Sequence, residues 1–192
     1  MSGHLQTAAD SNRLCQFCGL CCDGSLFFSA KLQPEDNPRT LASLGLRIKR
    51  RKGELHMLQP CTALQNGACR VYQNRPFRCR KFDCKQLQLL EKKQTTHEAA
   101  LQKIFEAKKQ LARLQTLLEQ SGDTREQKSL STRYETLFTE PLDPSPQAAH
   151  HRQEAQATMQ KLEAIFCEHF RTNTDEQASS NSVQHSQKKT VT

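Results

Sequence analysis

The stretch CQFCGLCC, residues 15–22, places four cysteines within eight residues. Eight of the nine cysteines in the chain precede residue 85, and the four downstream of the stretch are Cys61, Cys69, Cys79 and Cys84. A Cys-x-x-Cys turn directs two sulfurs and nearby backbone N–H groups into one concavity, so this spacing recurs in zinc knuckles, redox dithiols and iron–sulfur sites. The stretch therefore predicts that the chemistry of this protein depends on its thiols.

The spacing of the cysteines indicates metal ligands but leaves the number of metal sites open. Cys15, Cys18 and Cys21 match the first three ligands of the bacterial ferredoxin pattern, whereas Cys22 follows at once instead of after three residues and a proline. Adjacent side chains diverge in helices and strands, so this pair indicates two nearby sites or one ligand beside a free thiol. The sequence has no second Cys-x-x-Cys, which favours a mixed site or sites that draw on both cysteine groups. The predicted metal ligands are Cys15, Cys18, Cys21, Cys22, Cys61, Cys69, Cys79 and Cys84.

Disulfides, a redox dithiol and buried structural thiols each account for the cysteines less well than metal binding does. A secreted disulfide framework is disfavoured because the first residues lack the basic start and apolar run of a signal peptide. A thioredoxin-like dithiol requires a βαβ pattern around it, which the sequence does not show. Buried structural thiols are usually scattered rather than clustered. We therefore expect zinc or iron as the cofactor, with a 4Fe-4S cluster slightly favoured by the Cys-x2-Cys-x2-Cys spacing.

A family resemblance supports the same interpretation. The run at 15–22, together with PCTALQNGACRVYQNRPFRCRKFDC at 60–84, resembles the CxxCxxCC zinc- or iron-chelating proteins, also called the YkgJ-like cysteine-cluster family. The resemblance covers about residues 12–85 and implies a small metal-binding domain, mostly without known activity. Flagellin lysine N-methylases also carry such a domain and are associated with an iron–sulfur cluster. The matching positions are Cys15, Cys18, Gly19, Cys21, Cys22, Pro60, Cys61, Gly67, Cys69, Val71, Tyr72, Arg75, Pro76, Cys79, Arg80 and Phe82.

The composition predicts a mainly α fold in two parts. Hydrophobic residues make up 35% of the chain and aromatic residues 6%, which is little material for a large core. Metal binding would compensate, because it contributes directly to the free energy of folding. We expect a small irregular metal-stapled cysteine-cluster domain at 13–85, followed by a long antiparallel helical hairpin at 86–171. Residues 1–12 and 172–192 are predicted to be disordered.

Hydrophobic spacing and turn residues place the expected elements along the chain. The two long helices pack as a coiled-coil-like hairpin or present an open apolar surface to a protein partner. Cys167 falls near the apolar side of the second helix and is expected to be buried. The expected elements are an extended segment at 25–33, a turn at 34–38, a short helix at 39–46, a hairpin at 47–58, helices at 85–120 and 147–170, and a proline-containing linker at 121–147 with a helical turn or two at 132–138.

The positive charge lies entirely in the cysteine-rich part. The chain carries a net charge of +8, and residues 1–85 hold 14 Lys and Arg against 6 Asp and Glu, whereas residues 86–192 hold 14 of each. Basic residues beside the ligands would stabilise thiolates. The Arg47–Lys52 run has no cysteine beside it. It is therefore either a solvated loop or a surface that binds an external acidic partner. The residues interleaved with the ligands are Arg70, Arg75, Arg78, Arg80 and Lys81.

We expect a zinc- or iron-binding module as the function and keep two alternatives. The first alternative is an iron–sulfur-dependent enzyme related to the flagellin lysine N-methylases. The absence of a Gly-rich cofactor loop from the sequence argues against this alternative. The second is a basic, metal-stapled nucleic-acid binder. No apolar run is long enough to span a membrane, and free thiols indicate the cytoplasm. Because composition changes at Lys85, we also expect the cysteine domain to keep its metal without residues 121–192.

Overall fold

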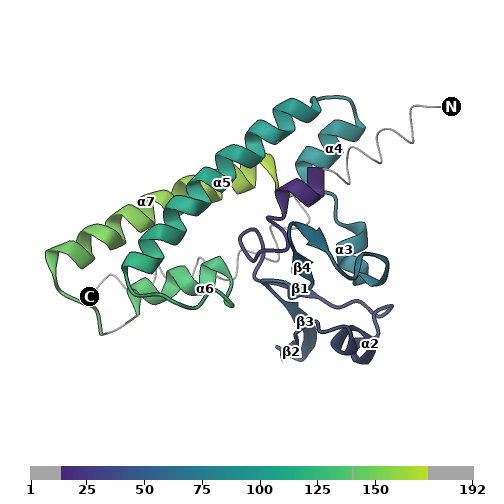
Figure 1. The fold of residues 1–192 in the computed structure, drawn as a ribbon, viewed down its shortest axis with the longest axis horizontal. Coiled ribbons are helices and arrows are strands. Elements are labelled where there is room, and N and C mark those ends of the chain that lie inside the picture. The colour runs from purple at the N-terminus through teal and green to yellow at the C-terminus, as the bar shows by residue number, and fades with distance from the viewer. Residues whose placement is uncertain (1–13, 140, 173–192) are drawn as a thin grey trace.

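The computed structural model describes residues 14–139 and 141–172, and these form a mainly helical fold with several short strands (Figure 1). Residues 14–18 are also helical. None of the helices in these two described ranges is long and apolar enough to cross a membrane. The elements are β1 (Ser29–Lys31), α2 (Pro38–Ser43), β2 (Ile48–Arg51), β3 (Glu54–Leu58), β4 (Leu64–Gln65), β5 (Ala68–Cys69), η1 (Tyr72–Asn74), α3 (Phe77–Lys81), α4 (Lys85–Glu91), α5 (His97–Gln120), α6 (Leu130–Glu135), η2 (Thr136–Phe138) and α7 (Pro146–His169).

The two long helices α5 and α7 lie alongside each other over most of their length (Figure 1). Their apolar stripes face inward, and Ile104, Leu114, Leu162 and Phe166 are almost fully buried. The expected second long helix and the expected helical turns in the linker are confirmed by α7, α6 and η2. Since this connection carries α6 and η2 instead of a plain loop, the helical hairpin stays a prediction.

The expected continuous helix over residues 85–120 is wrong, because the chain breaks between α4 and α5. Lys93 has a left-handed φ of 56°, which ends α4 just after its C-cap at Lys92. The Thr96 hydroxyl then accepts a hydrogen bond from the Ala99 N–H at 3.1 Å and caps the start of α5. A capping threonine offers the backbone a partner outside the helix, so the polar segment between the two helices does not stay helical.

The strands form a three-stranded antiparallel sheet in the order β1-β3-β2. The expected hairpin at 47–58 is confirmed by β2 and β3, which are joined by Lys52 and Gly53. Both turn residues have positive φ angles, 47° and 82°, as a two-residue type I′ turn requires. This geometry leaves β2 as an edge strand that carries exposed basic residues.

A second hairpin, β4–β5, was not predicted from the sequence. Its turn is Asn66-Gly67, with φ angles of 49° and 77°. Asn-Gly between short strands is the strongest local hairpin signal, so the sequence did contain the information. The hairpin carries Cys69 at its end and packs on a small core made of Leu32, Leu41, Leu46, Met57, Ala63 and Val71.

The cysteine-rich stretch lies between this small core and a larger helical core. Leu14, Leu20 and Leu26 are buried in the same cluster as the apolar residues of α5, α6 and α7. The Leu130 N–H at the start of α6 also donates to the Gly24 carbonyl at 3.0 Å. Side chains from both sides of residue 85 therefore share one core, and the division into domains at that residue stays a prediction. We name the two clusters the helical core and the sheet core.

Candidate metal centre

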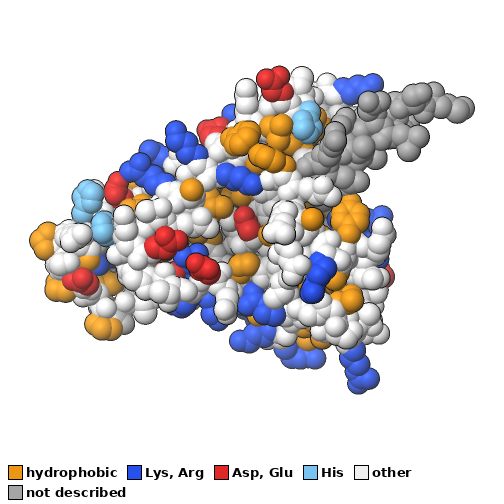
Figure 2. Space-filling view, viewed as in Figure 1, with side chains coloured by type: hydrophobic (Ala, Val, Ile, Leu, Met, Phe, Trp, Pro, Cys, Tyr) orange, Lys and Arg blue, Asp and Glu red, His pale blue; other side chains and the backbone are white. Residues whose placement is uncertain are grey.

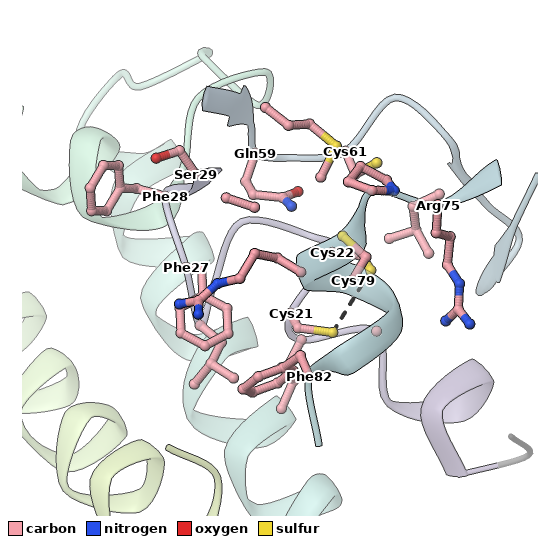
Figure 3. A pocket seen from close by; sticks show the side chains of 18 of the residues that line it. Cys21, Cys22, Phe27, Phe28, Ser29, Gln59, Cys61, Arg75, Cys79 and Phe82 are labelled. Carbon is pink, nitrogen blue, oxygen red and sulfur yellow. Dashed lines mark hydrogen bonds between the residues drawn. The ribbon is translucent and has the colours of Figure 1, made fainter. Parts of the chain in front are cut away.

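All eight predicted ligands line one cavity of about 860 Å³. Figure 3 shows four of them, Cys21, Cys22, Cys61 and Cys79. Cys15 and Cys18 lie in the helical segment at 14–18, and the Cys21-Cys22 pair lies in the turn after it. The other thiols come from segments that are remote in sequence: Cys61 precedes β4, Cys69 ends β5, Cys79 lies in α3, and Cys84 is the N-cap residue of α4. The ninth cysteine, Cys167, is exposed on α7, so the expectation that it is buried is wrong.

Gly19 reverses the chain in the middle of the CxxCxxCC run. Its φ is +70°, in the left-handed region that glycine adopts readily at helix C-termini. The Gly19 N–H donates to the Cys15 carbonyl at 3.1 Å, and the Gly19 carbonyl accepts from the Cys22 N–H at 2.8 Å. This turn brings the second half of the run back beside the first half, so all four thiols face the cavity.

The Cys21 and Cys22 sulfurs lie only 3.8 Å apart, and the expectation that adjacent thiols diverge is wrong here. That expectation holds for strands and helices, whereas residues 20–24 form a turn. Two thiolates bound to one tetrahedral metal, with metal–sulfur bonds of about 2.3 Å, would lie about 3.8 Å apart. The pair is therefore close enough to serve one metal or to stand at the junction of two.

Cys61 is fixed against the run by the backbone. The Cys61 N–H donates to the Cys22 carbonyl at 2.7 Å, across 38 intervening residues. Gly24 permits this approach, since a Cβ at that position would lie 3.1 Å from the Pro60 nitrogen. Because real Cβ contacts are rarely so close, Gly24 is a positioning residue, and the sequence analysis missed it.

Cys69 and Cys79 are placed by contacts of two further residues, Gly67 and Asp36. A Cβ at Gly67 would lie 2.9 Å from the Gln16 carbonyl oxygen, so only glycine lets the β4–β5 turn touch the segment between Cys15 and Cys18. Asp36 accepts a hydrogen bond of 2.7 Å from the Phe77 N–H at the start of α3, which orients the helix that carries Cys79. The sequence analysis gives Gly67 only as a position of the family resemblance and does not single out Asp36, because each contact joins distant segments.

Cys84 is placed by the helical half of the molecule. The Lys85 N–H, next to Cys84, donates to the Phe170 carbonyl at 3.1 Å. The Gln86 side chain donates to the His169 carbonyl at 2.8 Å. The end of α7 therefore holds the start of α4, and with it the eighth thiol.

Burial among apolar groups raises the pKa of several of these thiols. Desolvation raises the pKa of Cys18 and of Cys79 to about 12, and it also raises the pKa of Cys61 and Cys84. Cys15 is more exposed, but desolvation of its thiol and the charges of Cys84 and Cys22 raise its pKa as well. A cation bound among the thiols would remove this penalty.

The hydrogen bond of the Cys21-Cys22 pair and two nearby cations also change the pKa values of the thiols. The hydrogen bond between the two thiols lowers the pKa of Cys22 and raises that of Cys21, because one thiol donates to the thiolate of the other. The positive charge of Arg75 lowers the pKa of Cys22 and Cys79, and the charge of Lys108 on α5 lowers that of Cys18.

Arg75 is the interleaved basic residue whose charge acts on the thiols. Its Nε donates to the Tyr72 carbonyl at 3.0 Å, and its guanidinium lies 3.7 Å from the centre of the Tyr72 ring. Two other predicted residues interact elsewhere. The Arg70 guanidinium reaches the Leu44 carbonyl at 3.4 Å, and that of Arg80 lies over the Phe77 ring.

The donor set fits zinc or iron in its chemistry but is not arranged as a coordination shell. Thiolates are the preferred ligands of zinc in structural sites and of iron–sulfur clusters. Within residues 14–139 and 141–172, no group of three or more His, Cys, Asp or Glu side chains is positioned to hold a metal ion. We therefore expect metal binding to draw the sulfurs inward within the cavity.

A comparison with known proteins identifies the cysteine-rich part. Residues 14–103 match a family model described as "CxxCxxCC: Putative zinc- or iron-chelating domain". This segment is a CxxCxxCC domain. The match extends past residue 85, through α4 and into α5. No curated protein and no solved structure matches the chain.

Proposed function

We propose that this protein binds zinc or iron through the thiolates of its eight clustered cysteines. The observation that carries the proposal is that eight thiols from remote segments line one cavity. The description of the CxxCxxCC domain as zinc- or iron-chelating supports it. Bound metal supplies the positive charge that desolvated thiolates need, so the fully ionised ligand set is stable only with metal present.

In this proposal the metal staples a small cysteine-cluster domain, and a helical hairpin of α5 and α7 serves as scaffold or as a surface for a protein partner. The α6 region and the end of α7 contact the cysteine segment through Gly24 and Lys85, which supports the scaffold role. The cytoplasm is the proposed location, because eight metal-binding thiols must stay reduced.

Iron bound as a 4Fe-4S cluster is the form that the Cys-x2-Cys-x2-Cys spacing favours, and zinc is the alternative. The test is purification without oxygen, followed by metal analysis, acid-labile sulfide analysis and a visible absorption spectrum. Brown protein with iron and sulfide would support the cluster. Colourless protein with tightly held zinc would assign zinc, and protein that retains and takes up neither metal would overturn the proposal.

A second candidate is an iron–sulfur-dependent enzyme related to the flagellin lysine N-methylases. The cavity volume of about 860 Å³ favours it, because small-molecule sites usually have volumes of about 300–1,000 Å³. Such an enzyme would keep one iron without a protein thiolate, so that a small molecule could bind it. A cluster whose spectrum is unchanged by added small molecules, with every iron held by cysteine, would exclude this candidate.

Nucleic-acid binding is a third candidate, supported only by the charged sheet edge. Lys and Arg side chains gather over β2 and its neighbours in Figure 2, and Lys49, Arg50, Arg51 and Lys52 are exposed. Arg47, by contrast, donates to the Pro60 carbonyl at 2.7 Å and has a structural role. Binding that weakens steeply with salt would support this candidate, and absence of binding at low salt would exclude it.

A further inference from the structure

We propose that the eight thiols form two separate metal centres of four cysteines each. One centre crosslinks segments that pack on the helical core, and the other crosslinks segments that pack on the sheet core. The inference rests on the proposed metal binding and adds the number of centres, their ligands and their structural roles. The helical centre comprises Cys15, Cys18, Cys21 and Cys84, and the sheet centre comprises Cys22, Cys61, Cys69 and Cys79.

Packing assigns five of the thiols. Cys18 and Cys21 pack against the helical core, together with Phe27 and Phe82. Cys61, Cys69 and Cys79 pack against the sheet core instead. Figure 3 shows Cys21 beside the two phenylalanines, with Cys22, Cys61 and Cys79 on the other side of the Cys21-Cys22 contact.

A backbone contact assigns Cys22 to the sheet group. The Cys22 carbonyl accepts the hydrogen bond of 2.7 Å from the Cys61 N–H. Figure 3 shows Cys22 beside Cys79, on the same side of the Cys21-Cys22 contact as Cys61.

Local structure and packing assign Cys15 and Cys84 to the helical group. Cys15 lies in the same short helical segment as Cys18 and directly follows Leu14, which is buried in the helical core. Phe82, two residues before Cys84, packs against the same core and meets the Phe27 ring edge-on at 5.2 Å between ring centroids. This packing places Cys84 with the thiols that face the helices.

Two groups of four thiols match the number of thiolate ligands that either kind of metal centre takes. A closed zinc site takes four thiolates, and so does a four-iron cluster. The division uses every clustered cysteine and excludes only the exposed Cys167. It also explains the Cys21-Cys22 sequence, because two adjacent thiols in a turn, 3.8 Å apart, can each begin a different centre.

The two centres would stabilise different parts of the molecule. The helical centre joins the cysteine segment to α4, whose start is held by the end of α7, and Lys108 on α5 donates to the Phe17 carbonyl at 2.6 Å beside it. The sheet centre joins β5 and α3 to the same cysteine segment. Loss of one centre is therefore expected to loosen one core while the other keeps its structure.

The first test is cobalt titration of the metal-free full chain, followed by absorption of cobalt–thiolate charge transfer. Wild type is expected to saturate at about two ions per chain, each with four thiolates. Cys18→Ser and Cys79→Ser should each keep about one four-thiolate ion, and Cys167→Ser, the matched control, should keep about two. Saturation of wild type at one ion would overturn the division but not metal binding, and no binding of cobalt, zinc or iron would overturn the proposed function itself.

The second test needs no variant and so does not depend on the folding of a mutant. The metal-free full chain is given one equivalent of cobalt, its free thiols are alkylated, and chains carrying one ion are sequenced by mass spectrometry. The protected thiols should be one whole group, either Cys15 with Cys18, Cys21 and Cys84, or the other four. A protected set that joins Cys18 to Cys61 and Cys79, or protection of all eight together, would contradict two separate centres.

Discussion

At the scale of single residues, one glycine decides whether the second hairpin can reach the cysteine run. Gly67 has a left-handed φ of +77°, and a Cβ added to it would lie 2.9 Å from the Gln16 carbonyl oxygen. Gln16 lies directly after Cys15, so this contact keeps the hairpin that carries Cys69 beside the run. The glycine is needed for its conformation and also for the space it leaves.

We expect Gly67→Ala to lower both stability and metal affinity. The left-handed conformation alone costs a residue with a Cβ about 1–2 kcal/mol, and the contact with Gln16 adds strain. Gly53→Ala is the matched control, since it has a similar φ of +82° but no atom within 4 Å of the added Cβ. Chemical denaturation and competitive metal titration measure the two effects. Equal losses in the two variants would show that the Gln16 contact is unimportant.

At the scale of elements, a buried ion pair fixes α6 to the end of α5. Asp123 follows α5 and accepts hydrogen bonds of 2.6 Å from the Nε atoms of Arg125 and Arg133. Arg133 lies on α6 and is only 5% exposed. Since α6 in turn donates from Leu130 to Gly24, this ion pair helps to position the chain directly after the Cys21-Cys22 pair.

We expect Asp123→Asn to destabilise the protein by about 3–5 kcal/mol, the usual effect of removing one partner of a buried pair. Desolvation raises the pKa of Asp123, but the hydrogen bonds from Arg133 and Arg125 outweigh it and hold the pKa below its usual value. The stabilising effect is thus complete above the unfolded pKa of about 3.9 and is lost as pH falls through the folded pKa.

Denaturation of wild type and variant at several pH values tests this. The stability difference should be constant at neutral pH and shrink below about pH 4, and metal loss in acid affects both proteins alike. The control is Asp143→Asn, because Asp143 is exposed and accepts a local hydrogen bond from the Ser145 N–H. A difference that does not change with pH would disprove a role for the Asp123 charge.

At the scale of the whole molecule, residues from both sides of residue 85 share one core. Leu14, Leu20 and Leu26 of the cysteine segment lie in the helical core with residues of α5, α6 and α7. Arg171, just beyond α7, also donates to the Leu26 carbonyl at 3.3 Å. This shared packing favours a metal domain that depends on residues 121–192, the opposite of what the change in composition at Lys85 suggests.

We expect a chain without residues 121–192 to bind less metal than the full chain and to expose apolar surface. Removing α6 and α7 uncovers Leu14, Leu20 and Leu26 and releases the start of α4 beside Cys84. A chain without residues 173–192 is the control and should keep its full metal content. Metal analysis and binding of a hydrophobic dye measure the difference. Full metal content in the shorter chain would support the separable domain that composition suggests.

Local patterns were sufficient to find the candidate ligands and several elements. The thiol cluster is a matter of composition and spacing, and the β2–β3 hairpin and α7 follow from turn residues and from the repeat of apolar positions. The Asn66-Gly67 turn and the Thr96 cap are also local signals that the sequence contains. These features depend on residues close together in the chain, which is why a sequence by itself can determine them.

The arrangement of the thiols was decided only by tertiary structure. Three hydrogen bonds join segments that are tens of residues apart. They link Cys61 to Cys22, Phe77 at the start of α3 to Asp36, and Lys85 to Phe170. Spacing along the chain carries no information on such contacts, because they depend on how apolar faces divide between the two cores. For the same reason the sequence could name eight candidate ligands, whereas the grouping that we propose for them rests on which thiols lie against the helical core and which against the sheet core.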